Sequence, residues 1–357
     1  MYSYKHYIPI LRWKKAEQDA LGLVDNEKKE NITPLIELVP LSPRKKDKVI
    51  VKSKEDVLKE TIASLPNKIT DIWGHNRIYL DLFNVALFFQ HLAATTVFTI
   101  INNESSNIIP VFRLNTDSSL IKEIVPYLRQ HCNRFCLRLI REDINGDLKL
   151  RITKFLEQYD VTPNNVDLLF DMKLVHCDES TLLENFISSI PYLGEWKNFI
   201  VAGGSFPPDM SNFDVNTGSK HLWPRSDWIT WVTITTKANQ SIRKPSYSDY
   251  TIQHPIFLDT STFFPSANIR YASNKSWIVM RGRKLIDHGF LQYLGLANLL
   301  LQEKEYLGDK FSKGDEYIAE KGSNMSATKP GTPTTWLRAG INHHISLVVD
   351  QIIKLDD

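Results

Sequence analysis

The sequence has few or none of the features that mark several common classes of protein. Only 3 of its 357 residues are cysteine. An odd number of cysteines, without the spacing of a zinc site, indicates free thiols in a reducing compartment. Residues 1–15 contain no long apolar stretch, so we expect no signal peptide. The most apolar run, 85–101, is interrupted by Gln90 and His91 and is too short and mixed to cross a membrane. We therefore expect a soluble, cytoplasmic protein.

Net charge and recognisable motifs are scarce as well. The formal net charge is only +2, so binding to nucleic acid or to an anionic membrane would need a local basic patch. No GxGxxG or GxxxxGK[ST] pattern follows an expected strand, which removes the usual fingerprints of nucleotide-binding sheets. His343 and His344 are adjacent, whereas two metal ligands on one helix face would be four residues apart.

What the chain does contain is a regular alternation of short apolar runs and helix-like segments. The runs that read as strands are residues 7–11, 34–39, 77–83, 108–114, 134–140, 166–171 and 198–202. Near-continuous apolar strands are typical of a parallel sheet that is buried on both faces. Their regular succession favours a closed barrel over an open, doubly wound sheet. We therefore predict an α/β fold, a (β/α)8 TIM-like barrel with an elaborated C-terminal region and a C-terminal helix.

We expect a single barrel domain over residues 1–357. Its parts would be the first seven βα units (1–246), a polar excursion with the eighth strand and its helix (247–312), and a loop with the C-terminal helix (313–357). The eighth strand has two candidates, 256–258 and 277–280. The second is favoured because a strong helix pattern, 291–306, follows it.

Three further expectations concern the connecting segments. A helix over residues 54–65 should end at Pro66. The polar stretch 313–335 should be a connection that leads to a last helix at 334–354. The basic segment 41–54 should be a solvated loop or flexible arm.

Charged and small residues lie near the C-terminal ends of the expected strands. They are Glu37, Asp81, Arg113, Arg138 and Asp171, with Gly203, Gly204 and Ser205 after the seventh strand and Arg281 at the end of the favoured eighth. A charge within a strand that is buried on both faces is costly unless it is paired. In a barrel these positions converge on the C-terminal mouth, where the catalytic groups of the fold lie. The sequence leaves two roles open for them: a functional site, or a structural ion network that closes the mouth.

As a functional site, this set would suit a phosphorylated ligand. The carboxylates of Glu37, Asp81 and Asp171 could act in catalysis and hold Mg²⁺ or Mn²⁺ through their oxygens. The arginines would grip a phosphoryl group with paired N–H donors. The backbone N–H groups of 203–205 would also bind phosphate, as loops after late barrel strands do.

Residues 247–283 form the most unusual stretch, since they are rich in aromatic, amide and Arg side chains suited to a planar or anionic ligand. The candidate ligand contacts from this stretch and the last helix are Gln253, Asn268, Arg270, Tyr271, Arg281 and His344. His254 is a candidate general acid or base near neutral pH. The alternative is a long excursion that covers one end of the domain, with structural roles for both histidines.

A series of phrases along the chain carries a resemblance to a known family. The phrases are YIPILRWKKAEQDAL, TPLIELVP, IIPVFRLN, VAGGSFPP, YTIQHP, SANIRYAS, WIVMRGR, FSKGDEYI and WLRAGINHHISLVVDQI, which together run from Tyr7 to Ile352. With them the chain resembles the beta family proteins of phages, prophages and bacterial defence islands. The resemblance implies a role in phage–host conflict, as one component of a multigene defence cassette that also encodes a partner protein. It transfers no catalytic motif.

Three functions are therefore open. The protein could be a metal-dependent phosphoester- or nucleotide-processing enzyme with its site at the barrel mouth. It could instead be a sensor or partner subunit in antiviral defence, with a ligand-binding mouth, and the lack of a catalytic motif favours this function. Nucleic-acid binding through the basic residues 44–54 is the third, and the low net charge speaks against it.

Overall fold

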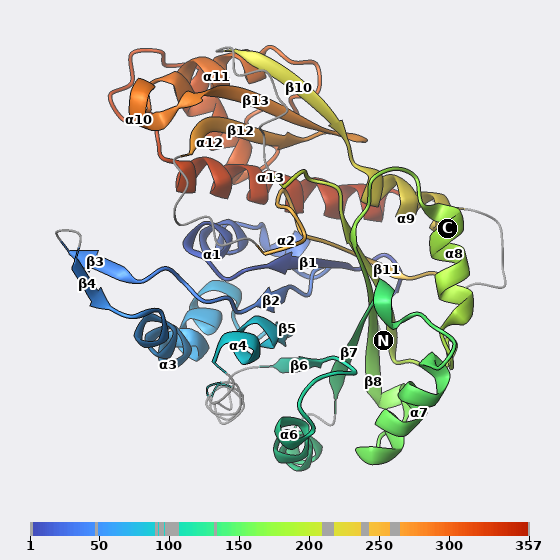
Figure 1. Ribbon diagram of the computed structural model, residues 1–357. Helices are drawn as coiled ribbons and strands as arrows, with labels where there is room; N and C mark the ends of the chain where they lie inside the picture. The colour runs from blue at the N-terminus through green and yellow to red at the C-terminus, as the bar shows by residue number, and fades with distance from the viewer. Residues whose placement is uncertain are drawn as a thin grey trace.

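Eight parallel strands close into a barrel in the order β1-β11-β9-β8-β7-β6-β5-β2 (Figure 1). They are β1 (Tyr7–Leu11), β2 (Leu35–Glu37), β5 (Ile78–Asp81), β6 (Ile108–Phe112), β7 (Phe135–Ile140), β8 (Val166–Leu174), β9 (Asn198–Gly204) and β11 (Ser246–Asp249). This computed structural model describes residues 3–46, 49–89, 92, 96, 107–131, 134–208, 218–236, 243–257 and 265–355. The α/β, TIM-like barrel predicted from the sequence is confirmed, and so are its first seven strands.

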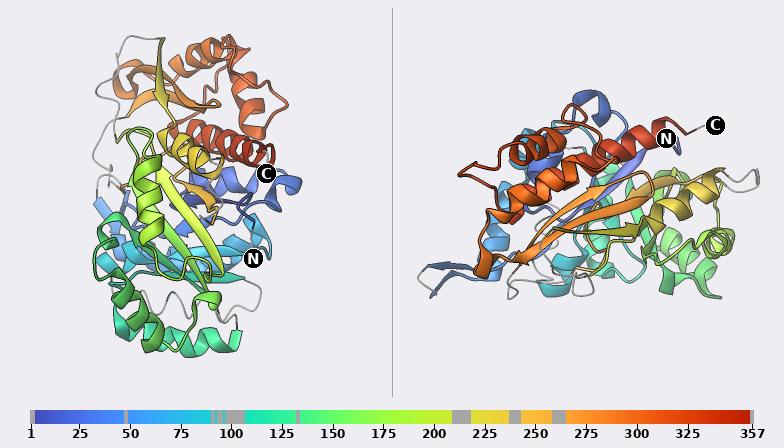
Figure 2. Two further views of the ribbon diagram at one scale, coloured as in Figure 1. Left: turned by 90° about the vertical axis from the view of Figure 1, so that its right-hand side faces the viewer. Right: turned by 90° about the horizontal axis from the view of Figure 1, so that it is seen from above.

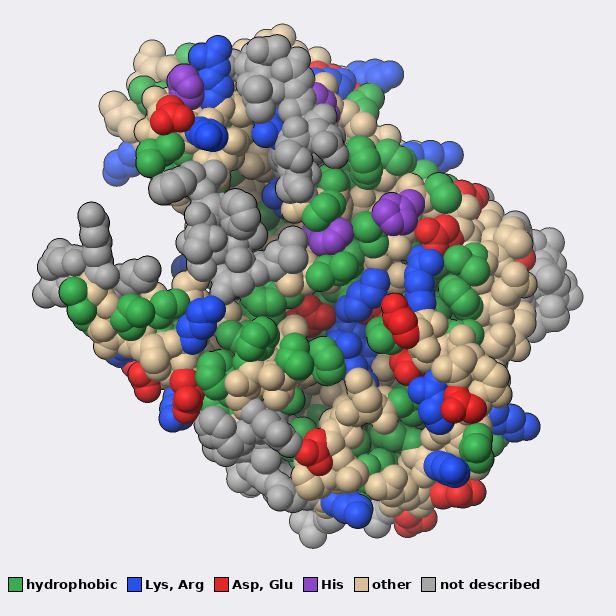
Figure 3. Space-filling model, viewed as in Figure 1, with side chains coloured by type: hydrophobic (Ala, Val, Ile, Leu, Met, Phe, Trp, Pro, Cys, Tyr) green, Lys and Arg blue, Asp and Glu red, His purple; other side chains and the backbone are tan. Residues whose placement is uncertain are grey.

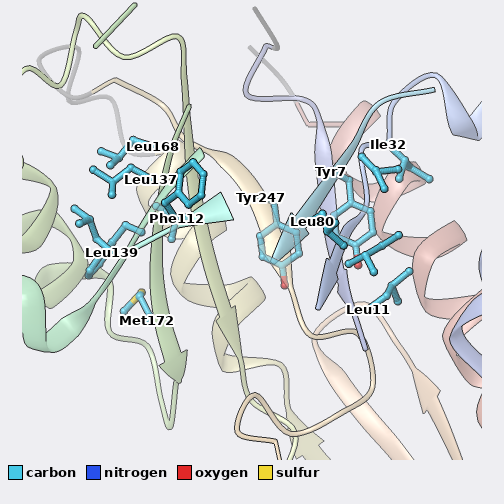
Figure 4. Packing of buried hydrophobic residues seen from close by; sticks show 14 of the residues in the cluster. Tyr7, Leu11, Ile32, Leu80, Phe112, Leu137, Leu139, Leu168, Met172 and Tyr247 are labelled. Carbon is cyan, nitrogen blue, oxygen red and sulfur yellow. The ribbon is translucent and has the colours of Figure 1, made fainter. Parts of the chain in front are cut away.

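Helices surround the barrel. They are α1 (Lys15–Gly22), α2 (Asn26–Lys29), α3 (Lys54–Trp73), α4 (Phe83–Phe88), α6 (Ser118–His131), α7 (Leu148–Gln158), α8 (Ser180–Ser189) and α9 (Ser226–Thr236), with 3-10 turns at Arg141–Asp143 and Pro163–Asn165. Alternate strand residues such as Tyr7, Leu80 and Leu137 belong to the large buried core that the strands share with these helices (Figure 4). The side chains in between point into the barrel.

The barrel interior is filled in layers. Its middle is apolar, with Ile10, Tyr79 and Leu169 among the buried side chains. At the N-terminal end of the strands, the Arg134 guanidinium donates to both oxygens of Asp167, at 2.7 and 2.9 Å. An ion pair thus occupies the N-terminal end of the barrel interior.

A second layer lies over one side of the barrel (Figures 1 and 2). Its antiparallel sheet has the order β10-β13-β12. The layer comprises β10 (Ser219–Pro224), β12 (Ser266–Ala272), β13 (Ser276–Lys284), α10 (Leu285–His288), α11 (Gln292–Leu301), α12 (Lys313–Gly322) and α13 (Pro333–Ile353). Helix α13 runs between layer and barrel: Ile341 and Ile345 join the barrel core, while Trp336 joins the core of the layer.

The prediction of the eighth strand was wrong. The strand that closes the barrel is β11, which pairs with β1 and β9, whereas Trp277–Met280 lies within β13 of the second layer. Residues 256 and 257 form no strand, and residue 258 lies outside the described ranges. The sequence of β11, SYSD, contains no apolar run. The strand is nevertheless buried, because its polar side chains form hydrogen bonds inside the protein. For example, the Ser248 hydroxyl donates to the Ile8 carbonyl at 2.6 Å.

Three expectations about connections were also wrong. Helix α3 continues through the buried Pro66 to Trp73, since one proline removes only one backbone hydrogen bond from a helix that is packed along its length. The polar connection contains α12, and the side chain of its N-cap residue, Ser312, accepts from the Asp315 N–H. The basic segment forms a hairpin of β3 (Arg44–Lys46) and β4 (Val49–Lys52). Within the described ranges, no helix is both long and apolar enough to span a bilayer.

Candidate functional site

Aspartates fix the rim of the barrel at the C-terminal ends of three strands. Each carboxylate accepts a hydrogen bond from the backbone N–H two residues further along the chain. The pairs are Asp81 with Phe83 (2.8 Å), Asp171 with Lys173 (2.9 Å) and Asp249 with Thr251 (2.9 Å). Such turns hold the carboxylate against the chain that leaves the strand. Part of the strand-end charge therefore serves to shape the rim.

Arg138 lies at the centre of the mouth and contacts all three predicted carboxylates. It is fully buried. Its Nη1 donates to Glu37 at 2.9 Å and to Asp81 at 2.5 Å, and its Nη2 donates to Asp171 at 2.6 Å. The C-terminal ends of the strands face the viewer in Figure 1. The same face in Figure 3 carries a central group of Lys and Arg side chains flanked by acidic ones.

Tyr250 and Lys173 complete this ion network. The Tyr250 hydroxyl accepts from Arg138 (2.6 Å) and from Lys173 (2.7 Å) and donates to Asp171 (2.6 Å). Burial raises the pKa of Tyr250 well above its usual value. Burial also acts to raise the pKa of Asp171, but Lys173 and Arg138 outweigh it and the pKa is lowered. Tyr250 is therefore neutral and Asp171 ionised at pH 7.

Arg113 is a further buried cation of the mouth. Its Nη2 lies 3.3 Å from Asp81, and its guanidinium stacks on the Phe83 ring at 3.7 Å. Burial would raise the pKa of Asp81, yet Arg113 and Arg138 lower it overall. Asp81, like Asp171, is therefore ionised near neutral pH, while burial lowers the pKa of Lys173.

The three carboxylates do not fit a divalent cation as they are arranged. The space among them is taken by the Arg138 guanidinium, which stays charged in proteins. No group of three or more His, Cys, Asp or Glu side chains with metal-binding geometry occurs among the described residues. The metal-binding and catalytic roles of Glu37, Asp81 and Asp171 stay predictions.

Beside the mouth lies a pocket of about 640 Å³. The chain segments that line it follow the C-terminal ends of β1, β2, β9 and β11, and α3, β12 and α13 complete it. Its described lining includes five cationic side chains, Arg12, Lys14, Lys15, Lys68 and Arg270, against one carboxylate, Glu17. Ligands of barrel proteins bind at this end of the strands, so this pocket is the candidate ligand site.

Arg12 joins the pocket to the mouth. Its Nη2 donates to the His254 carbonyl at 2.6 Å, and its Nε lies 3.9 Å from the Glu37 carboxylate. Gln253, a predicted ligand contact, also lines the pocket and donates to Glu17 at 2.7 Å. Two of the strand-end loops are thus held together around the pocket.

Two more predicted residues, His254 and Arg270, line the pocket. A ring nitrogen of His254 lies 2.9 Å from the Phe206 carbonyl, and burial lowers the pKa of His254, so the ring is neutral at pH 7. Arg270 donates to the Ile252 carbonyl at 2.9 Å. Burial lowers the pKa of Arg270 to about 10, and the side chain therefore keeps its charge at pH 7.

The remaining predicted ligand-binding residues neither line the pocket nor form hydrogen bonds with Arg138. Ser205 donates to Asp227, Asn268 accepts from Arg270, Tyr271 donates to Asp315, His344 pairs with Asp249, and Arg281 lies in β13. Gly203 and Gly204 are buried at the end of β9, and a Cβ on Gly204 would come within 3.2 Å of Tyr250. The phosphate-binding role of Gly203, Gly204 and Ser205 stays a prediction.

Sequence reasoning missed several residues of the site. Arg12 follows the first strand directly, so the strand-end criterion that selected Arg113 could have selected it too. Lys173 lies just beyond the expected end of the sixth strand. Tyr250 was not predicted because β11, which it follows, was not recognised as a strand. No sequence signal brings Lys68 of α3 to the same pocket.

Fold and site together define a TIM-like barrel protein with an ion-paired mouth and a cationic pocket beside it. A family model described as Beta protein matches residues 7–350, nearly the whole chain. The protein therefore belongs to the Beta protein family, as the sequence resemblance indicated. Membership is compatible with a phage-associated protein. No curated protein matches the chain.

Proposed function

We propose that the protein is a sensor or partner subunit in a phage–host conflict system and binds an anionic ligand at the C-terminal end of its barrel. The observation that supports this most is the excess of cations in the pocket, with five positive side chains against one carboxylate among the described lining residues. A second protein from the same defence cassette would respond to the bound or free state.

Binding is favoured over metal-dependent catalysis because of Arg138. A metal ion would have to displace a guanidinium that donates to Glu37, Asp81 and Asp171 at 2.5–2.9 Å. Charge-assisted hydrogen bonds of this kind are among the strongest in proteins. The metal-dependent enzyme is therefore the second candidate, and it predicts that ligand binding needs Mg²⁺ or Mn²⁺.

Calorimetric titration with inorganic tripolyphosphate tests the anion site. Lys68 is exposed, so Lys68→Gln should fold normally. We expect it to bind about fivefold more weakly, because one charge about 4 Å away in water contributes about 1 kcal/mol. The matched control is Lys149→Gln, an exposed lysine on α7 outside the pocket. No binding by the wild type, or equal affinities of the two variants, would contradict the proposal.

A phage-plating assay tests the conflict role in cells that carry the complete cassette. A Lys15→Gln, Lys68→Gln double variant should lower protection in step with its loss of anion affinity. The control is Lys149→Gln with Lys154→Gln, which removes the same charge from α7. Full protection by a pocket variant that no longer binds tripolyphosphate would separate the pocket from defence and refute its sensor role.

A further inference from the structure

The first turn of α1 lines the pocket, and its sequence is a poor start for a helix. The N-cap residue is Lys14, and its side chain makes no capping hydrogen bond. Ser, Thr, Asp and Asn are the preferred residues at this position. Lys14 and Lys15 also bring positive charge to the positive end of the helix dipole, where it is unfavourable, against one acidic residue of the first turn, Glu17.

Three other helices, α3, α12 and α13, start with a capping side chain. Ser53 and Asp56 form a reciprocal capping box at the start of α3, as Thr332 and Thr335 do at α13. The start of α1 differs from these helices in having a lysine at the N-cap position and no capping side chain.

A second observation lies in the same segment. Arg12 Nε, Trp13 Nε1 and Glu17 Oε2 are buried and have no hydrogen-bond partner among the described residues. The three residues are at most 8 % exposed and line the pocket. Trp13 also has a φ of 49°, which a bulky side chain rarely adopts. An unseen ligand is one explanation for unpaired buried polar atoms, and strained backbone clusters at functional sites.

We infer that the N-terminus of α1 binds a phosphate group of a nucleoside polyphosphate. This inference rests on the proposed function, because it concerns the ligand of the same pocket. The first N–H groups of a helix and its dipole attract phosphate, and a bound phosphate would relieve the repulsion that Lys14 and Lys15 create. Of the five lining cations, Lys15 is also paired with Asp19 at 2.7 Å. Arg12 also lies 3.9 Å from Glu37. The five cations still outnumber the one carboxylate of the described lining, which suits a ligand with several negative charges.

The rest of the pocket lining suits the nucleoside part of the ligand. It is apolar and rich in proline, with Pro40, Pro207, Pro208, Ile256 and Phe257. The Phe257 ring lies 5.1 Å from Lys14 Nζ and 5.6 Å from the Arg12 guanidinium, so apolar and cationic surfaces adjoin. Free polyphosphate would leave the apolar part exposed to water, whereas a ligand with a planar apolar group would cover it. The volume is also ordinary for a small-molecule site.

Calorimetry with ATP, tripolyphosphate and adenosine as probes tests this assignment. We expect ATP to bind at least tenfold more tightly than tripolyphosphate, and adenosine to show no binding at millimolar concentration. Equal affinities for ATP and tripolyphosphate would refute the nucleoside part and leave the anion-binding function standing. If neither anion binds, both the inference and the proposed function are wrong.

Lys14→Asp tests the role of the helix terminus. An aspartate at the N-cap would accept from the free N–H groups and occupy the place of the phosphate. We expect Tm without ligand to rise by about 1 °C, and affinity for ATP to fall at least tenfold. The control, Lys149→Asp, adds an acidic residue to the first turn of α7 and should leave ATP affinity unchanged.

Unchanged ATP affinity in Lys14→Asp would overturn the assignment of phosphate to α1. If Lys14→Asp does not fold, the exposed Lys15 provides the test. Lys15→Gln should weaken ATP binding about fivefold. Equal ATP affinity of Lys15→Gln and wild type would again refute the assignment.

Discussion

Replacement of Arg138 by Met is the sharpest test of the ion network at the barrel mouth. The change leaves Glu37, Asp81 and Asp171 buried without the guanidinium that contacts all three. Breaking a buried ion pair by removing one partner costs about 3–5 kcal/mol. With an unfolding entropy of about 2.1 cal/mol/K per residue, a chain of 357 residues should lose about 4–7 °C in Tm.

The loss in Tm of Arg138→Met should depend on pH. Arg138 helps to hold the pKa values of Asp81 and Asp171 below their ordinary value. Its effect is smaller than that of Arg113 on Asp81 and smaller than that of Lys173 on Asp171. Without Arg138 these pKa values should rise, so that the folded variant takes up protons more readily. Protonation removes the unpaired buried charge. The loss in Tm should therefore be largest near pH 8 and smaller near pH 5.

Thermal unfolding followed by circular dichroism at pH 8, 6.5 and 5 measures both effects. The matched control is Arg151→Met, since Arg151 on α7 makes only partly exposed ion pairs with Asp143 and Asp147. Pairs of that kind contribute about 0–1 kcal/mol, and its Tm should change by no more than about 1 °C. An Arg138→Met variant as stable as the control, or a loss that does not depend on pH, would refute the network.

Further predictions concern acid stability, Tyr250 and the basic hairpin. The folded-state pKa values of Asp171 and Asp249 are lowered. Their contribution to the free energy of unfolding is thus complete above the unfolded-state pKa of about 3.9 and is lost as the pH falls toward the folded-state pKa values. Urea unfolding at pH 7, 4 and 3 would measure this loss. Tyr250→Phe removes a partner of two buried or half-buried cations and should cost about 1–3 kcal/mol, measured in the same way; a neutral effect would contradict the hydrogen bonds. Replacement of Lys45 and Lys46 by Gln should leave DNA retention on a filter at low salt unchanged, whereas steeply salt-dependent binding lost on replacement would revive the nucleic-acid binder.

The sequence predicted most of the barrel and part of its mouth. A charge inside an apolar run is conspicuous, and barrel geometry brings strand ends together, so Glu37, Asp81, Arg138 and Asp171 could be placed in one site before the structure was known. Their partners inside that site could not be predicted. Spacing along the chain does not show that one guanidinium lies among three carboxylates.

The parts that sequence reasoning missed have physical causes. Strand β11 satisfies its polar groups internally, so it lacks the apolar pattern by which strands are recognised. Because β11 was not recognised, the prediction took β13 as the eighth strand and placed Arg281 at the mouth. The pocket forms where loops after β1, β2, β9 and β11 meet the second layer, and no periodicity in the sequence indicates that these segments come together.

Titration with tripolyphosphate in EDTA tests the central claim most directly. The proteins would be the wild type and a folded Asp81→Asn, Asp171→Asn double variant, with Mg²⁺ or Mn²⁺ present in a second series. Binding through cationic side chains predicts that the wild type binds in EDTA and that the double variant keeps this affinity. Binding that needs a divalent cation and disappears in the double variant would contradict the claim and establish a metal site at the barrel mouth.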